Sequence, residues 1–346
     1  MKISCVCGLC VLFMVLPVHA QNNAATLRES GLKAYRDGHY AQAESLLHSA
    51  LEVQADVAAT AELYADMCSL FLEEEKIRDA EVTCRKANGL YRRLDDNHGI
   101  ALSLRHIGAT YFLEGRYDEA ISTLRQALKT ARKDRKASPF LTAMILNSLG
   151  MAYFRMDKLR KAEEMFEQAL KTADWREGPE ILTNLGATAY RQKKFERAEE
   201  LLKEAIRLTE IQLGRSHPKL MYTLSAMAKL YTDTGRFAEA QALYHRCLEI
   251  LERSDGDFAV RIAITLRALS DAYSKDGKTE QAEATLRRAS DIARQHLSDA
   301  AMPEILEAHA HLLLSTGKSE EARSLQAEAR RARIAIESTV RAYGSQ

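Results

Sequence analysis

An alanine recurs along this chain at nearly constant spacing, and this recurrence constrains the fold more than any other feature. It stands at Ala43, Ala80, Ala120, Ala162, Ala198, Ala240, Ala282 and Ala322, with successive spacings of 37, 40, 42, 36, 42, 42 and 40 residues. A second small residue follows each of them by seven positions, at Ala50, Ala87, Ala127, Ala169, Ala205, Cys247, Ala289 and Ala329. A small residue repeated at one place predicts that two helices nearly touch there, so that a larger side chain would overpack. The chain is therefore predicted to consist of eight copies of one helical hairpin.

Composition agrees with a helical repeat protein and excludes some function classes. Of the 346 residues, 46% are hydrophobic, 28% are charged and only five are proline. No segment of any length shows the alternation of apolar and polar residues that a strand needs. The formal net charge is +1, which argues against a dedicated nucleic-acid binder because such proteins carry a broad basic surface.

The N-terminus has the pattern of a secretory signal. A positive start at Lys2 precedes an uncharged apolar run from Ile3 to Val18, and Val18 and Ala20 stand at positions −3 and −1 of a signal-peptidase site. The run is short for a membrane span, which needs about 20 residues. We expect a signal peptide at 1–20, cleaved before Gln21, and a periplasmic or secreted protein that meets the membrane only through this segment. The alternative is an uncleaved N-terminal anchor.

Cleavage would leave Cys68, Cys84 and Cys247, too few for a disulfide scaffold. Cys68 and Cys84 lie at equal distances from a hairpin turn centred near Lys76, so they have matching heights in an antiparallel hairpin. In an oxidising compartment they could form a disulfide closing a loop of about 16 residues, for roughly 3 kcal/mol of stability. The alternative is that both are small buried apolar residues.

The clearest repeat also identifies a family. It runs Leu104, Ile107-Gly108, Tyr111, Gly115, Tyr117, Ala120, Leu124 and Ala127-Leu128, and it resembles the tetratricopeptide repeat. Most spacings lie near 42 residues, which resembles the longer repeats of kinesin light chains and of many bacterial repeat proteins. Two segments carry the same resemblance: Leu146-Asn147-Ser148-Leu149-Gly150 and Leu213-Gly214-Arg215-Ser216-His217-Pro218. Together with the signal pattern, this suggests an exported bacterial protein of that type.

The resemblance implies an all-α fold, a right-handed superhelix (α-solenoid) of about eight helical hairpins. A single array would occupy 21–346 and end in a short helical extension. Its repeats would lie at about 24–56, 61–93, 101–133, 143–175, 179–212, 221–253, 263–296 and 303–335.

The sequence carries no constellation typical of an enzyme. It lacks a Gly-rich phosphate loop, a Gly-x-Ser-x-Gly elbow and a His-Glu-x-x-His motif. His309 and His311 are two residues apart on a predicted helix and therefore point to nearly opposite sides, so they cannot chelate one metal ion together. We predict no enzymatic activity, no metal, no cofactor and no small-molecule substrate.

The predicted site is the inner groove that the first helix of each repeat lines in a tetratricopeptide superhelix. Aromatic residues recur there at one helical phase, and basic residues lie on the same face, among them Lys229, Arg267 and Lys275. The candidate partner-binding residues are Arg105, Phe112, Asn147, Phe154, Arg155, Tyr190 and Arg191. Aromatic faces would take apolar side chains, arginines would take carboxylates and an asparagine amide could bond an extended backbone. The alternative is that the aromatics only cover the seams between repeats.

These observations predict an exported scaffold that binds a segment of a protein or peptide partner in its concave groove. An alternative is a self-assembling or regulatory subunit of an envelope complex that uses the convex face or the array ends. The bare end after Ala329 and the Arg330-Arg331-Arg333 cluster would favour that alternative.

Overall fold

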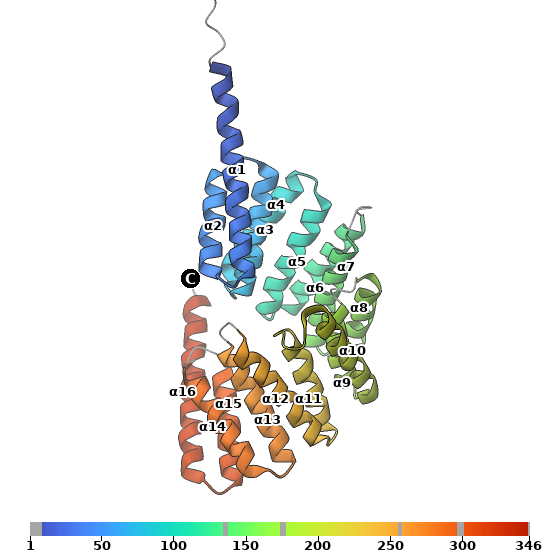
Figure 1. Cartoon of the computed structure of the whole chain (residues 1–346), viewed down its shortest axis with the longest axis vertical. Coiled ribbons are helices and arrows are strands. Elements are labelled where there is room, and N and C mark those ends of the chain that lie inside the picture. Colours follow the sequence, from blue (N-terminus) through green and yellow to red (C-terminus); the bar gives the residue numbers. More distant parts are fainter. Residues whose placement is uncertain (1–8, 134–137, 174–177, 255–257, 296–300, 345–346) are drawn as a thin grey trace, which may run out of the picture. The chain divides into compact units, whose positions relative to one another are not determined.

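Sixteen helices make up the described part of the computed structural model, which covers residues 9–133, 138–173, 178–254, 258–295 and 301–344 (Figure 1). No strand occurs among these residues. The chain divides into two compact units, unit 1 at Met1–Glu177 and unit 2 at Gly178–Gln346. Unit 1 contains α1 (Leu9–Arg36), α2 (Tyr40–Val53), α3 (Val57–Glu73), α4 (Ile77–Arg93), α5 (Asn97–Leu113), α6 (Tyr117–Lys133), α7 (Pro139–Arg155) and α8 (Leu159–Thr172). Unit 2 contains α9 (Gly178–Arg191), α10 (Phe195–Leu213), α11 (Leu220–Asp233), α12 (Phe237–Arg253), α13 (Ala259–Lys275), α14 (Thr279–Gln295), α15 (Ala301–Ser315) and α16 (Ser319–Gly344).

Each odd-numbered helix packs against the even-numbered helix that follows it, so each unit holds four hairpins, as the alanine spacing predicts. The recurring alanine lies near the start of the second helix, and the second small residue lies two turns further on. Both are fully buried in every hairpin, with 0% exposure from Ala43 and Ala50 to Ala322 and Ala329. The predicted all-α repeat architecture is thereby confirmed.

The first helix of the hairpin also has a position for a small residue, distinct from the two alanine positions of the second helix. The residue there faces a large residue that follows it by 16 positions in the sequence. A Cβ atom added at Gly108 would lie 2.7 Å from Leu124, and one at Gly150 would lie 2.5 Å from Phe166. Both distances are shorter than Cβ contacts in real proteins, so the helices cross too closely for any larger residue. Glycine is required at these two positions because the two helices of the hairpin approach each other closely.

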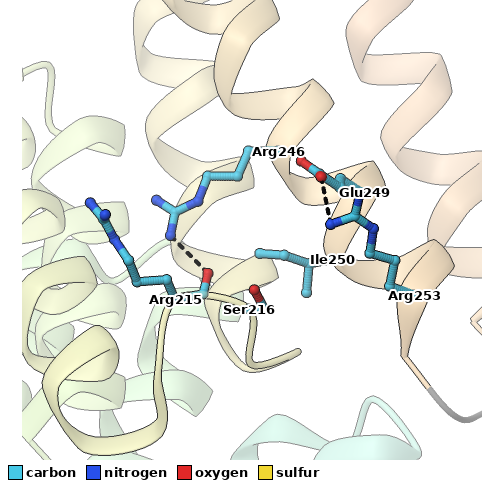
Figure 2. Close-up of a pocket in the computed structure, with 6 residues that line it drawn as sticks. All are labelled: Arg215, Ser216, Arg246, Glu249, Ile250 and Arg253. Atoms are coloured by element: carbon cyan, nitrogen blue, oxygen red, sulfur yellow. Dashed lines mark hydrogen bonds and ion pairs between the residues drawn. The ribbon is translucent and has the colours of Figure 1, made fainter.

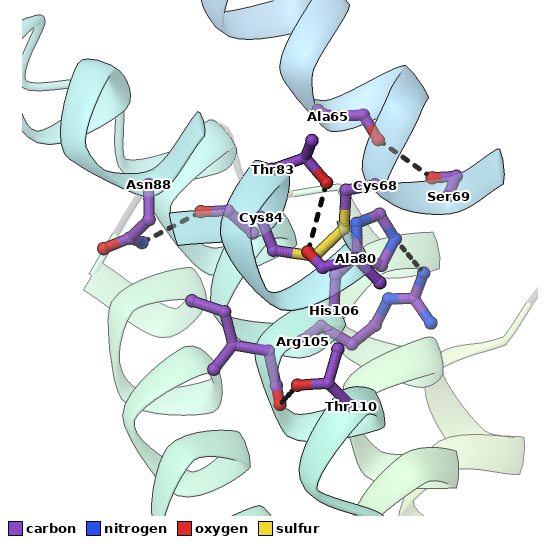
Figure 3. The surroundings of a disulfide bond; sticks show 12 residues. Ala65, Cys68, Ser69, Ala80, Thr83, Cys84, Asn88, Arg105, His106 and Thr110 are labelled. Atoms are coloured by element: carbon purple, nitrogen blue, oxygen red, sulfur yellow. Dashed lines mark hydrogen bonds between the residues drawn. A yellow bond between two sulfur atoms is a disulfide. The ribbon is translucent and has the colours of Figure 1, made fainter. Parts of the chain in front are cut away.

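In the second hairpin a disulfide occupies this same crossing. Cys68 of α3 holds the glycine position and Cys84 of α4 holds the position of the large residue, again 16 residues later. The two Cα atoms are 5.1 Å apart, within the usual range for a disulfide, and both side chains are fully buried (Figure 3). The bridge therefore stands where the other hairpins place a small residue against a large one.

The turn inside each hairpin needs a left-handed backbone residue, five positions before the alanine. Glycine supplies it in five hairpins, with φ between 75° and 83° at Gly38, Gly115, Gly235, Gly277 and Gly317. In the other three, the residues Glu75, Asp157 and Lys193 adopt the same conformation, with φ of 56°, 57° and 61°. Glycine tolerates this region without steric penalty, whereas other residues do not.

The hairpins of a unit are joined more closely on one side than on the other. In unit 1, α1 contacts α3, α3 contacts α5 and α5 contacts α7, and in unit 2 the same holds for α9, α11, α13 and α15. Among the described residues no two successive even-numbered helices of a unit bring Cα atoms within 8 Å of each other, and they meet only through long side chains such as the Arg246–Glu210 pair of α12 and α10. The odd-numbered helices therefore form the inner side of each curved unit, here called its inner face.

Tyrosines on the odd-numbered helices also tie neighbouring hairpins together. The hydroxyl of Tyr111 accepts a hydrogen bond from Arg85 of the preceding hairpin at 3.0 Å, and that of Tyr231 donates to Glu199 at 2.9 Å. Tyr153 and Arg125 form the equivalent bond at 2.6 Å. These bonds reach between repeats, which cannot bury their apolar faces alone.

The predicted signal peptide falls largely outside what the structure describes. Residues 1–8 are not described, and residues 9–20 form the first part of α1. Over the described ranges, no helix is long and apolar enough to cross a membrane.

Candidate protein-binding face

The predicted groove residues of unit 1 lie on α5 and α7, but their aromatic rings are partly used in packing. The Phe112 ring meets the Tyr117 ring edge-on, with centroids 5.6 Å apart, and Tyr117 begins the second helix of the same hairpin. Tyr35 with Tyr40, and Tyr190 with Phe195, pair at the same spacing with tilted rings, at centroid distances of 6.1 and 6.2 Å. An aromatic pair five residues apart therefore closes three of the hairpin turns, and the half-buried Phe112 and Phe154 retain only part of their surface for a partner.

The polar candidates of unit 1 differ in availability. Asn147 is only 8% exposed, so the expectation that its amide bonds a partner's backbone is not supported. Its burial follows from its place on α7, among residues that pack against the neighbouring helices. Arg155 is exposed and lies 5.8 Å from the centroid of the Tyr117 ring, so it remains available to an acidic group.

Arg105 is held against the protein by a buried neighbour. Its Nη2 lies 2.6 Å from Nε2 of His106. Burial, reinforced by the charge of Arg105, lowers the pKa of His106 well below its usual value, so the imidazole stays neutral. A neutral Nε2 accepts the bond from the guanidinium, and this keeps Arg105 half-buried.

In unit 2 a polar network joins three helices of the inner face. Asp233 of α11 accepts hydrogen bonds from Tyr190 of α9, from Lys229 at 2.8 Å and from Lys275 of α13 at 3.0 Å. Burial opposes ionisation of Asp233, but these bonds prevail and lower its pKa to about 2. Burial and the bond to Asp233 also raise the pKa of Tyr190. Tyr190 is therefore a seam contact between hairpins, the alternative role considered for these aromatics, while Arg191 beside it is exposed.

A cleft of about 620 Å³ opens on the inner face of unit 2, between α11, α13 and α15. Small and apolar side chains form its floor: Ala268, Leu286, Ala308 and Leu312, with the buried Tyr244 beneath. Basic groups lie around it: Lys229, Arg267, Lys275 and His311. Asp271 also lines the cleft and accepts from Lys275 at 2.9 Å.

Arg267 is distinguished from the other cations of the cleft by its lack of an internal acceptor. Lys229 and Lys275 both bond Asp233, whereas no hydrogen bond or ion pair joins Arg267 to any residue in the described ranges. A half-buried guanidinium with five N–H donors and no acceptor can bind a carboxylate in bidentate fashion. Arg267 is the strongest single candidate for contacting an acidic partner.

The cleft was not singled out by the aromatic pattern, although the sequence holds a signal for it. At the position of Phe112, Phe154 and Tyr190, α13 carries Ser274, which lines the cleft. A serine leaves open the space that a ring fills in α5 or α9. The loss of the aromatic, together with the basic residues already noted on this face, could have located the cleft.

No group of three or more His, Cys, Asp or Glu side chains that could hold a metal ion occurs in the part of the chain described by the structure. His309 and His311 illustrate this, since His309 is buried and bonds Ser290 through Nδ1 at 2.9 Å, while His311 is exposed at the cleft. The inner faces are equipped for binding through charge, hydrogen bonds and small apolar surfaces.

Family models decide the relationship. The model of the tetratricopeptide repeat matches residues 56–133, 99–174, 179–242 and 219–295, and a second model of the same repeat matches 147–210. The chain belongs to the tetratricopeptide-repeat family. Proteins of this family are generally non-catalytic scaffolds, and their fold supports protein–protein interaction.

Individual relatives agree with the long repeat. A curated protein from Arabidopsis thaliana, "Protein KINESIN LIGHT CHAIN-RELATED 3", is 29% identical over 73 residues, which cover 21% of this chain but only 11% of that protein. The crystal structure of BtubC (BKLC) from P. vanneervenii is similar with a TM-score of 0.56 and 25% identity, covering 64% of this chain and 92% of that one. A Rap protein complexed with Competence and Sporulation Factor has a TM-score of 0.60 at 14% identity, covering 80% of this chain and 77% of that one, and shows the fold alone. Tetratricopeptide repeats of the kinesin-light-chain type are thus confirmed.

Proposed function

We propose that this chain is an exported scaffold that binds an extended segment of a partner protein on its inner face, with the cleft of unit 2 as the principal contact. One observation carries the proposal. The cleft combines a floor of small apolar side chains with Lys229, Arg267 and Lys275, and Arg267 has no acceptor among the described residues. A segment that carries both apolar and acidic side chains fits this surface.

The chemistry assigns separate roles to the two parts of the cleft. An apolar side chain of the partner would cover Ala268, Ala308 and Leu312, and its burial would supply most of the affinity. A carboxylate would bond Arg267, which would fix register and accelerate association. In unit 1, Arg155 and the exposed parts of Phe112 and Phe154 offer a similar combination of a cation and apolar surface. Arg191, beside Tyr190, adds a further cation to the inner face of unit 2.

The alternative use of an array end has less support. Arg333, a member of the Arg330-Arg331-Arg333 cluster, pairs with Glu307 of α15 and thereby stabilises its own hairpin. A segment bound on the inner face remains the better explanation of the unpaired charge at the cleft.

Selection of peptides displayed on phage tests the binding mode. Residues 21–346 serve as bait, and an Arg267→Glu variant serves as the counter-selection. We expect enrichment of sequences that place an apolar residue near one or more acidic residues, and their loss on the variant. Equal enrichment on both proteins would exclude the cleft as the binding site.

Export is tested separately by N-terminal sequencing of the protein purified from its native source. The pattern Val18-His19-Ala20 before Gln21 motivates the expectation that the mature chain begins at Gln21. An intact Met1 on soluble protein would contradict export by cleavage, without affecting the proposal for the cleft.

A further inference from the structure

A second cleft, away from the inner face, is built from the connector between α10 and α11 and from one face of α12. Arg246, Glu249, Ile250 and Arg253 recur on α12 at the spacing of a single helical face, and Arg215 and Ser216 approach them from the connector (Figure 2). The cleft has a volume of about 420 Å³, within the range of small-ligand sites. All of it lies within unit 2.

The connector that forms one wall is held in place by its own contacts. Gly214 adopts φ of 89°, which directs the chain out of α10. Arg246 then donates to the carbonyl oxygen of Arg215 at 2.9 Å and to Oε1 of Glu210 at 2.5 Å. Arg246 is thus a bridge between α12, α10 and the connector, and it fixes where Arg215 and Ser216 stand.

The lining residues carry an excess of positive charge. Three guanidinium groups face one carboxylate, Glu249, which accepts from Nη1 of Arg253 at 2.8 Å. Glu210, behind the cleft, offsets Arg246. Arg215 reaches Glu210 only at 3.7 Å, beyond hydrogen-bond distance. The two carboxylates, Glu210 and Glu249, therefore leave one of the three guanidinium charges unbalanced.

Hydrogen-bond donors in this cleft exceed the acceptors that the protein supplies. Each guanidinium has five N–H donors, and Arg215 has no hydrogen-bond acceptor among the described residues. The exposed hydroxyl of Ser216 likewise has none there. Ile250, which is 4% exposed, provides an apolar part of the cleft lining. Exposed donors that have no protein acceptor, placed around a concave surface with one apolar side, are suited to an oxyanion attached to a small organic group.

We propose that this cleft, lined by Arg215, Ser216, Arg246 and Arg253, binds the phosphate group of a small soluble phosphate monoester. Such a group carries a charge of about −1.5 to −2 and three strong acceptor oxygens. Ser216 donates to those oxygens, and the exposed side chains of Arg215 and Arg253 turn inward to donate to them as well, while Arg246 holds the connector and contributes charge. The organic part of the ligand lies against Ile250. This site is separate from the inner face and does not depend on the function proposed there.

Isothermal titration with glycerol 3-phosphate tests the site, with inorganic phosphate and glycerol as comparison ligands at constant ionic strength. We expect saturable binding of glycerol 3-phosphate, weaker binding of inorganic phosphate and none of glycerol. An Arg215→Gln, Arg253→Gln double variant should weaken the binding by at least about tenfold, equivalent to about 1.4 kcal/mol. It leaves the Arg246–Glu210 pair intact, so the fold should be retained.

The matched control is an Arg207→Gln, Arg288→Gln double variant, which removes two exposed, ion-paired arginines elsewhere in unit 2. We expect it to bind glycerol 3-phosphate within about twofold of the unchanged protein. An equal loss in both double variants would show a diffuse charge effect and overturn the proposal. Lack of saturable binding up to about 10 mM ligand, which corresponds to less than about 3 kcal/mol, would overturn it as well.

Discussion

The crossings inside the hairpins and the inner face of unit 2 both use residues that recur at one place in the repeat, but only the crossings repeat the residue type as well. The alanine near the start of each second helix is fully buried in all eight hairpins, from Ala43 to Ala322. On the inner face, the position of Phe112 in α5 is taken by Ser274 in α13. A residue at a crossing is enclosed on every side, so only a side chain of one volume fits there. A residue on the inner face is in contact with solvent, so its identity can differ between repeats according to what the repeat binds.

This difference separates stability from binding in the same molecule. A substitution at a crossing should change the free energy of unfolding and leave the chemistry of the inner face alone. A substitution on the inner face should change binding and leave the free energy of unfolding nearly the same. The second hairpin is the informative exception among the crossings, because a disulfide there replaces the usual contact between a small and a large residue.

The largest expected effect is loss of the Cys68–Cys84 bridge. A Cys68→Ala, Cys84→Ala variant should lose about 3 kcal/mol of unfolding free energy, because the bridge closes a 16-residue separation and the alanines leave a void. A Cys68→Gly, Cys84→Leu variant should lose less, since it restores the pair seen at Gly108 and Leu124. Urea-induced unfolding measures both.

The bridge itself is checked by intact mass after alkylation under denaturing conditions. Without reductant only Cys247 of the mature chain should be modified, and two further thiols should appear after reduction. Modification of all three cysteines without reductant would show that Cys68 and Cys84 are merely core residues. Equal stability of the alanine and the glycine–leucine variants would contradict the equivalence of the two kinds of crossing.

The next largest effect concerns an ordinary crossing in unit 1. Ala162→Leu should lower the free energy of unfolding by about 1–3 kcal/mol, because the alanine is fully buried between α7 and α8. Lys161→Leu, one residue away and exposed, should stay within about 0.5 kcal/mol. Melting temperatures of the two variants decide the matter, and similar shifts would mean that the assigned repeat register is wrong.

A smaller effect is expected at the hairpin turns. Gly115→Ala places a β-carbon at φ of 75° and should destabilise by about 1 kcal/mol. Lys193→Gly relieves the same strain at φ of 61°, and after the entropy cost of glycine it should stabilise by about 0.5 kcal/mol. Thermal unfolding of the two variants should therefore shift in opposite directions, and a loss of stability in both would refute the idea that the turns are equivalent.

The regularity of the crossings explains why the fold could be predicted from the sequence. Ala120, Ala162 and their equivalents are required by the small volume available at each crossing. Their spacing in the sequence is therefore enough to locate the hairpins and to align the repeats with one another. The turn residues obey the same count, since Glu75 and Lys193 stand five positions before their alanines, where other hairpins carry glycine. The pairing of Cys68 with Cys84 could be raised because both lie at equal distances from the turn.

The inner face was harder to predict because equivalent positions there have different neighbours. Tyr190 has the phase of Phe112, yet it bonds Asp233 of the next hairpin, a residue 43 positions later. Asn147 is covered by surrounding helices, which its own helix phase does not reveal. The cleft beside Arg267 arises where rings are absent from α13 and α15, so it is defined by small residues on several helices together.

The central claim, that the cleft of unit 2 binds an acidic and apolar segment, is tested most directly by fluorescence anisotropy with a peptide selected on the unchanged protein. Arg267→Glu should weaken the affinity at least about tenfold, because it replaces the unpaired guanidinium by a repelling carboxylate. Arg323→Glu, an equal charge change on the exposed surface of α16, should leave the affinity within about twofold. Unchanged affinity in Arg267→Glu, with the fold intact, would contradict the account.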